Sequence, residues 1–120
     1  MAATLDYDGH VRRIVQIHFD PQTGAPYWLE RQRELGLDAR TQIRGLSDLD
    51  RLGPMDERAL STRPLLDFVP HSRRGQLAGA VVTETGGTTG PPKRTIFTRD
   101  EFEQGFVEPF VRAADFAGFP

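Results

Sequence analysis

The string TETGGTTGPPK, Thr83–Lys93, constrains the fold of this chain more than any other feature of its sequence. Before it lies Leu77–Val82, a run of small and β-branched residues typical of a buried strand, and after it lies Arg94–Phe97, where exposed and apolar positions alternate as in a second strand. A plain hairpin needs only a few residues, so a glycine-rich loop of this length suggests a loop built around a ligand. Thr98, followed three residues later by Glu101, has the capping-box pattern that starts a helix. These residues together predict a β–loop–β–α unit.

The helix that begins after Thr98 carries an apolar stripe, which Pro109 should kink or divide into two helices. The stripe consists of Phe102, Phe106, Val107, Phe110 and Ala114. A unit with two strands needs more strands to complete a sheet and cover this stripe, and the rest of the sequence does not supply them. We therefore interpret residues 77–120 as an incomplete unit and expect the chain to be the N-terminal piece of a larger protein.

Residues 1–76 predict a helical N-terminal region. Val11–Phe19 places several apolar residues on one helical face, but its β-branched residues leave a strand open as an alternative. Pro26 should begin a helix that Gly36 ends, with Tyr27 and Trp28 in a core. Two short helices and an irregular connection whose apolar residues still pack should follow, at Ser47–Leu52, Met55–Ser61 and Thr62–Gln76.

The composition excludes several classes of function. The formal net charge of −2 gives no electrostatic case for binding nucleic acid or an anionic membrane, and the absence of cysteine excludes disulfides and thiolate metal sites. The first residues show no signal peptide, and no apolar run is long enough to span a bilayer, so we expect a cytoplasmic protein. The three histidines are scattered, and no spacing of acidic residues and histidines predicts a metal centre.

The loop itself has the chemistry of a phosphate site. Its glycines allow positive φ angles and a close approach of the backbone to a ligand, and consecutive free N–H groups in such a turn bind anions. Threonine hydroxyls can hold phosphate oxygens or contribute to a magnesium ligand shell, and Lys93 can place a cation beside the phosphates. The sequence therefore predicts a clamp on the β- and γ-phosphates of ATP.

The loop differs from the common P-loop of phosphotransferases. That motif requires G-x-x-x-x-G-K-[ST] followed by a helix. In this chain Gly90 is followed by two prolines before Lys93, and a strand comes next. A P-loop phosphotransferase is therefore a rival interpretation that the sequence argues against.

TGGTTGPPK, Thr85–Lys93, resembles the signature loop of the adenylate-forming (AMP-binding) superfamily. The extended string TETGGTTGPPKR most resembles the phenylacetate–CoA ligase branch, whose members often carry E-T-[SG]-G-T-T-G-x-P-K-R. Upstream, PYWLERQRELGLD and GLSDLDRLGPMDERAL are similar in order and spacing to two segments of that branch. The resemblance runs from about Pro26 to the end of the chain, and only the loop is specific.

The resemblance implies an α/β fold in which residues 77–120 begin the AMP-binding core of a larger mixed-sheet adenylation domain. It implies activation of a carboxylic acid by ATP, with Mg²⁺, to an acyl- or aryl-adenylate with release of pyrophosphate, and then thioester formation with coenzyme A or a carrier. Aromatic acids are suggested by the branch alone. The positions that would bind the ATP phosphates are Thr85, Gly86, Gly87, Thr88, Thr89, Gly90 and Lys93.

This chain lacks other motifs that the superfamily needs. These are an aromatic-Gly-x-Thr-Glu segment for adenine and magnesium, an aspartate for the ribose, and a lysine in a mobile C-terminal domain. We therefore expect the chain alone to be inactive, with no catalytic residue assigned, and to need a downstream polypeptide or a partner chain besides its nucleotide and acid. The alternative is a non-catalytic module, a truncated relic or half of a split enzyme, that binds a nucleotide or a partner through its aromatic helix.

Overall fold

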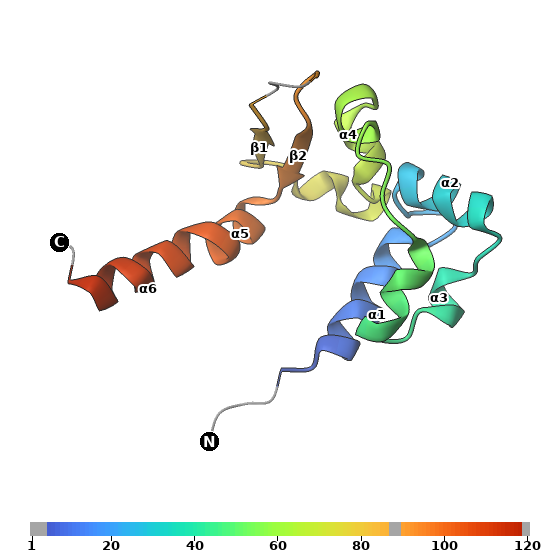
Figure 1. Cartoon of the computed structure of the whole chain (residues 1–120), viewed down its shortest axis with the longest axis horizontal. Coiled ribbons are helices and arrows are strands. Elements are labelled where there is room, and N and C mark those ends of the chain that lie inside the picture. The colour runs from blue at the N-terminus through green and yellow to red at the C-terminus, as the bar shows by residue number, and fades with distance from the viewer. Residues whose placement is uncertain (1–4, 87–89, 119–120) are drawn as a thin grey trace. The chain divides into compact units, whose positions relative to one another are not determined.

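The computed structural model describes residues 5–86 and 90–118 of the chain and combines helices with a two-stranded antiparallel sheet (Figure 1). The chain divides into two compact units, an N-terminal unit Met1–Arg74 and a C-terminal unit Gly75–Pro120, which are described separately. In chain order the helices and strands are α1 Tyr7–His18, α2 Pro26–Leu35, α3 Ala39–Gln42, η1 Leu46–Leu52, α4 Ala59–Thr62, η2 Leu65–Phe68, η3 His71–Gln76, β1 Val81–Glu84, β2 Arg94–Phe97, α5 Arg99–Phe102, η4 Glu103–Val107 and α6 Glu108–Ala117.

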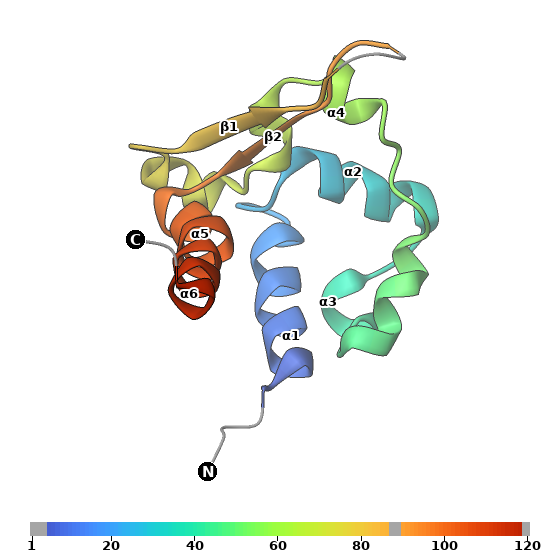
Figure 2. The ribbon, with the colours of Figure 1, turned by 60° about the vertical axis from the view of Figure 1, so that its left-hand side comes forward.

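The segment that the sequence left open between helix and strand is the helix α1. The helix begins earlier than the apolar pattern because the Asp6 carboxylate accepts a hydrogen bond from the Gly9 N–H at 2.8 Å and so caps its first turn. Val11 and Val15 share one face of α1 and join a core that α3 completes (Figures 1 and 2). The sequence pattern did not reveal α3. The core cluster consists of Val11, Val15, Phe19, Ala39 and Ile43.

The connection between α1 and α2 is a turn. One carboxylate oxygen of Asp20 accepts the N–H groups of Gln22 at 2.9 Å and Thr23 at 3.0 Å. The Gly24 N–H donates to the Asp20 carbonyl and the Ala25 N–H donates to that of His18. The backbone N–H groups of this turn are therefore satisfied locally, which allows Gly24 and Ala25 to be buried.

The pKa of Asp20 lies below its ordinary value because its carboxylate accepts the backbone N–H groups of Gln22 and Thr23. A lowered folded-state pKa means that this carboxylate contributes stability above its unfolded-state pKa, and that the contribution is lost as the pH falls through the folded-state value. We expect Asp20→Asn to be less destabilised than the wild type by a fall from pH 7 to about pH 3. Urea unfolding at the two pH values measures this, and an identical loss of stability in both proteins would contradict it.

The helix α2 follows its sequence signals. Proline lies in its first turn, and Gly36 ends it in the left-handed conformation at φ +63°, with the Leu37 N–H donating to the Gln32 carbonyl. Tyr27 is buried, and its ring centroid lies 4.9 Å from that of Trp28 and 5.0 Å from that of Phe68, so the prediction that Tyr27 and Trp28 belong to a core is confirmed.

Arg63 closes this aromatic cluster. Its guanidinium lies 5.4 Å from the Tyr27 ring centroid and pairs with Asp67 at 2.9 Å and with Glu30 at 3.0 Å. The pKa of Arg63 is raised, mainly by its hydrogen bond to Asp67 and to a smaller extent by its hydrogen bond to Glu30. These contacts tie η2 to α2.

Two predictions between residues 55 and 76 are correct only in part. The helix predicted at Met55–Ser61 begins only at Ala59, as α4, because the Asp56 N–H donates to the Tyr27 hydroxyl and the Asp56 carboxylate accepts the Arg58 N–H. Thr62–Gln76 is not irregular throughout, since it contains the 3-10 helices η2 and η3. The expectation that its apolar residues pack is confirmed for Val69, which is 6% exposed.

In the C-terminal unit the first strand is shorter and less buried than predicted. Residues 77–80 form a turn in which the Ala80 N–H donates to the Leu77 carbonyl and Gly79 has a φ of +74°. Strand β1 therefore begins at Val81, and Val82 is 49% exposed, so the prediction of a buried strand at Leu77–Val82 is wrong. In the described part of the chain the sheet has only two strands. Side chains of β1 alternate between the two faces of this sheet, and one face is left exposed.

The capping box is confirmed, since the Thr98 hydroxyl accepts the Glu101 N–H and the Glu101 carboxylate accepts the Thr98 N–H. The helices α5, η4 and α6 follow one another without a break (Figure 2). The middle segment is a π-helical turn, in which the Glu108 N–H donates to the Glu103 carbonyl. Pro109 then lies in the first turn of α6, a position that tolerates proline although proline has no backbone N–H. The sequence left open whether Pro109 kinks the helix or begins a second one; in the structure the helical path continues through this segment, and α6 begins at Glu108.

Candidate functional site

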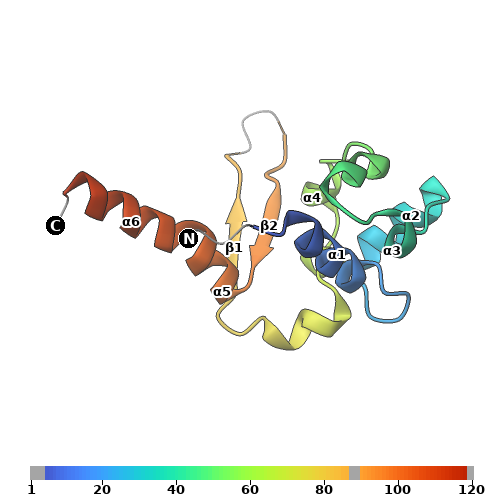
Figure 3. The ribbon, with the colours of Figure 1, turned by 90° about the horizontal axis from the view of Figure 1, so that it is seen from below.

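The candidate site is the loop that joins β1 to β2. The strands pair antiparallel with Val81 opposite Phe97 and Glu84 opposite Arg94, and they lie side by side (Figure 3). The hydroxyl oxygens of Thr83 and Thr95 meet across the strands at 2.6 Å. The two strands that the sequence placed on either side of the loop are thus one hairpin, and the loop crosses its open end.

The hydrogen bonding continues one step beyond the last strand pair. The Thr85 N–H donates to the Lys93 carbonyl at 3.0 Å, and the Lys93 N–H donates to the Thr85 hydroxyl oxygen at 3.0 Å. Two of the predicted phosphate-binding residues are therefore brought together, at the two ends of the loop. Sequence reasoning assigned both residues to phosphate and missed the bond between them. No signal in the sequence alone reveals this bond, because it depends on the strand register, in which 85 and 93 follow the pair 84 and 94.

Of the other residues predicted to bind phosphate, the structure describes some and not others. Gly86 and Gly90 follow and precede the closing pair, while Gly87, Thr88 and Thr89 lie outside the described residues. Gly86 is not among the glycines with positive φ, and a Cβ atom at Gly86 or Gly90 would meet no described atom within 4 Å. The described packing of the chain therefore does not itself require glycine at either position.

Charge and hydroxyl groups gather at the stem of the loop. Lys93 and Arg94 supply two positive charges, against the single carboxylate of Glu84, which pairs in register with Arg94. The threonines of the stem add hydroxyl groups that can donate to phosphate oxygens. The arrangement can bind an anion, and it holds no His or Cys that could act as a nucleophile.

Beyond the loop, the described residues offer little to other kinds of site. Within 5–86 and 90–118 no group of three or more His, Cys, Asp or Glu side chains could hold a metal ion. In the same residues, no helix has the length and apolar character that crossing a membrane requires.

Comparison with known proteins finds no family model that matches the chain and no curated protein with a matching sequence. The functional interpretation therefore depends on the loop, its stem and the arrangement of the elements around it.

Proposed function

We propose that this chain is the N-terminal part of an ATP-dependent ligase that activates a carboxylic acid as an acyl- or aryl-adenylate and then forms a thioester with coenzyme A or a carrier. The observation that carries the proposal is the TGGTTGPPK loop at the open end of a two-stranded hairpin, with Thr85 and Lys93 closing its two ends. We propose further that the hairpin and the helix after it begin the AMP-binding core of a larger mixed-sheet domain.

In this function the loop positions the triphosphate of ATP. Its backbone N–H groups and threonine hydroxyls would hold the oxygens of the β- and γ-phosphates, with the Lys93 ammonium beside them. A carboxylate oxygen of the acid then attacks the α-phosphorus, the bond from that phosphorus to the β-phosphate oxygen breaks, and pyrophosphate leaves. No acid or base is required from the loop, so its contribution is orientation and neutralisation of charge.

Magnesium would neutralise phosphate charge in this reaction when it is bound. The described residues contain no acidic cluster that could hold the ion by themselves. The residues present therefore fit a magnesium ion that would arrive bound to the phosphates of ATP. Threonine hydroxyls of the loop would be its contacts with the protein.

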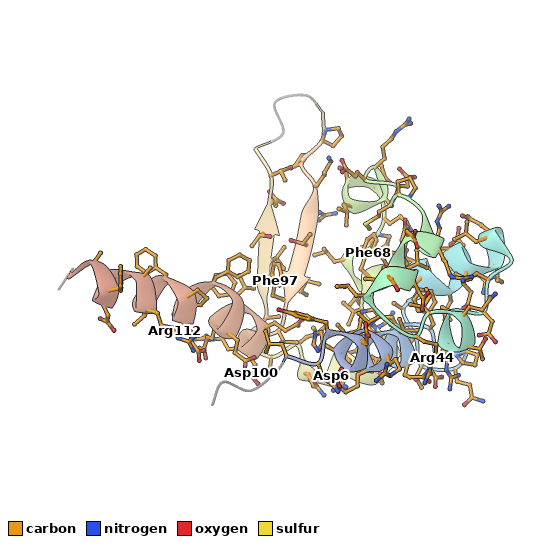
Figure 4. All side chains as sticks on the ribbon, turned by 60° about the horizontal axis from the view of Figure 1, so that its bottom comes forward. Asp6, Arg44, Phe68, Phe97, Asp100 and Arg112 are labelled. Atoms are coloured by element: carbon orange, nitrogen blue, oxygen red, sulfur yellow. The ribbon has the colours of Figure 1, made fainter. Side chains whose placement is uncertain are left out.

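We also propose that the polypeptide carrying the adenine, ribose and acid sites packs on the exposed apolar side chains of the C-terminal unit. Phe110 is 73% exposed and Phe116 is 96% exposed, although the rings of Phe102 and Phe106 pack with that of Phe97. Phe97 lies on strand β2 (Figure 4). Exposed apolar residues in this number on one helix indicate a surface that another polypeptide covers. The unpaired edges of the described two-stranded sheet offer backbone hydrogen bonds to the same partner.

The reaction is tested by ATP–pyrophosphate exchange with a panel of aryl and alkyl carboxylic acids. We expect no exchange with this chain alone and exchange when the completing polypeptide is present. Exchange by the chain alone would show that it is a complete adenylating unit and would contradict the division proposed here.

The second candidate is a non-catalytic module that binds a nucleotide or a partner chain, and the exposed aromatic residues of α6 favour it as much as they favour the ligase. The two differ in one result. A module binds MgATP or a partner but supports no exchange with any complementing polypeptide or acid.

We expect Lys93→Ala to weaken binding of MgATP about tenfold or more, because hydrogen bonds to charged groups contribute about 1.5–3 kcal/mol. Gly87→Val should weaken binding as well, since a branched side chain would keep the backbone from the phosphates. Titration calorimetry with the completing polypeptide present measures both. Arg99→Ala is the matched control, because Arg99 belongs to the same unit but pairs with Glu103 at 2.8 Å. Unchanged affinity in both loop variants would overturn the phosphate assignment.

A further inference from the structure

Thr85 and Lys93, one step beyond the last strand pair, are joined by one backbone–backbone hydrogen bond and one hydrogen bond to a side chain. At this step of the ladder the Thr85 N–H donates to the Lys93 carbonyl, and the Lys93 N–H donates to the Thr85 hydroxyl oxygen, each at 3.0 Å. The side chain of Thr85 thereby fixes the peptide plane that carries Lys93.

A threonine hydroxyl that accepts one hydrogen bond still has its own hydrogen to donate. Thr85 can therefore hold the Lys93 amide and donate to a phosphate oxygen at the same time. Valine has nearly the same shape as threonine but can do neither, whereas serine can do both.

We propose, on the basis of the function proposed above, that Thr85 is a positioning residue for Lys93. Its hydroxyl holds the Lys93 backbone amide, and with it the point from which the Lys93 side chain extends, before the nucleotide arrives. Preorganisation of this kind raises affinity because binding does not have to order the group.

Thr83 provides the comparison within the same hairpin. Its hydroxyl also makes a cross-strand bond, to the Thr95 hydroxyl at 2.6 Å, but that bond does not involve Lys93. Thr83→Val weakens the hairpin through a lost hydroxyl bond and leaves the Lys93 amide with its acceptor, so it is the matched control.

The first measurement is amide hydrogen exchange of Lys93 by NMR on the full chain without nucleotide. We expect Lys93 to exchange faster in Thr85→Val and to remain near the wild-type rate in Thr85→Ser and Thr83→Val. An unchanged Lys93 rate in Thr85→Val would overturn the proposal whatever the chain binds.

The second measurement is the affinity for MgATP and for AMP. We expect Thr85→Val to lose about three- to tenfold in affinity for MgATP, Thr85→Ser to retain it, and AMP to be unaffected. In the Lys93→Ala background the additional loss from Thr85→Val should be much smaller, because the two residues act together.

The outcomes separate this proposal from the proposed function. If the wild type binds MgATP and Thr85→Val binds it equally well, the positioning role is wrong and the function stands. A full additional loss in the Lys93→Ala background would show that Thr85 acts independently of Lys93, and would also overturn the role. If the wild type binds no MgATP with the completing polypeptide present, the proposed function fails, and the positioning role falls with it even where the exchange rates show the bond.

Discussion

Ile43→Ala should lower the free energy of unfolding of the N-terminal unit by about 3–5 kcal/mol, the largest effect expected of any single substitution described for this protein. Ile43 has 0% exposure and is a large side chain of the core cluster, where it lies with Val15 of α1 and Ala39 of α3. Removing its branched chain loses apolar burial and leaves a cavity, because α1 and α3 are both fixed by other contacts.

Urea unfolding followed by the fluorescence of Trp28 measures this loss. Trp28 is the only tryptophan of the chain and packs against the same core, so its emission reports this unit. Ile14→Ala is the matched control, because Ile14 is 42% exposed on the helix α1, and it should cost about 1 kcal/mol or less. A loss below about 1 kcal/mol in Ile43→Ala would show that the core collapses around the cavity or that Ile43 is not buried.

Gly24→Ala should destabilise the same unit by about 2–4 kcal/mol. A Cβ atom at this position would lie 2.4 Å from the His18 carbonyl oxygen and 2.6 Å from that of Asp20. Both atoms belong to the backbone of the turn that joins α1 to α2, and the Gly24 N–H donates to the second of them. The turn must therefore move before the methyl group fits.

Gly45→Ala is the control for this substitution, because its added methyl group would clash with a side chain and not with the backbone. Its Cβ would lie 2.6 Å from a carboxylate oxygen of Asp8, and that side chain can rotate away at the cost of its bond to the Leu46 N–H. We expect this variant to lose only about 1 kcal/mol. The same urea measurement compares the two, and an equal or smaller loss in Gly24→Ala would mean that the turn relaxes freely.

The signals that predicted structure correctly act over a few residues. Gly36 ends α2 because its own φ is positive, and Thr98 starts α5 because its hydroxyl reaches an N–H three residues away. Arg94–Phe97 is a strand with the bounds that its alternation predicts. In each case the atoms that decide the outcome lie within one turn or one strand of each other.

The differences arise where a cap, a turn or a contact between residues far apart in the sequence overrides the pattern within the segment. The predicted helix at Met55–Ser61 starts late because Asp56 donates to the hydroxyl of Tyr27, 29 residues away. Val11–Phe19 could not be assigned from its own residues, since the Asp6 cap and the core around Ile43 decided for a helix. The first strand was placed four residues early because Gly79 turns the chain and β1 begins only where β2 can pair with it.

For the candidate site, the sequence by itself determined the residue types of the loop, and with them the phosphate chemistry proposed for it. Glycines, hydroxyl groups and a lysine in that order are properties of the chain, independent of its fold. Only the tertiary structure decided that the strands pair as one hairpin and that the Thr85 hydroxyl holds the Lys93 amide. The physical reason is that a hydrogen bond depends on register, and register is set by how two strands pair across space and not by either strand alone.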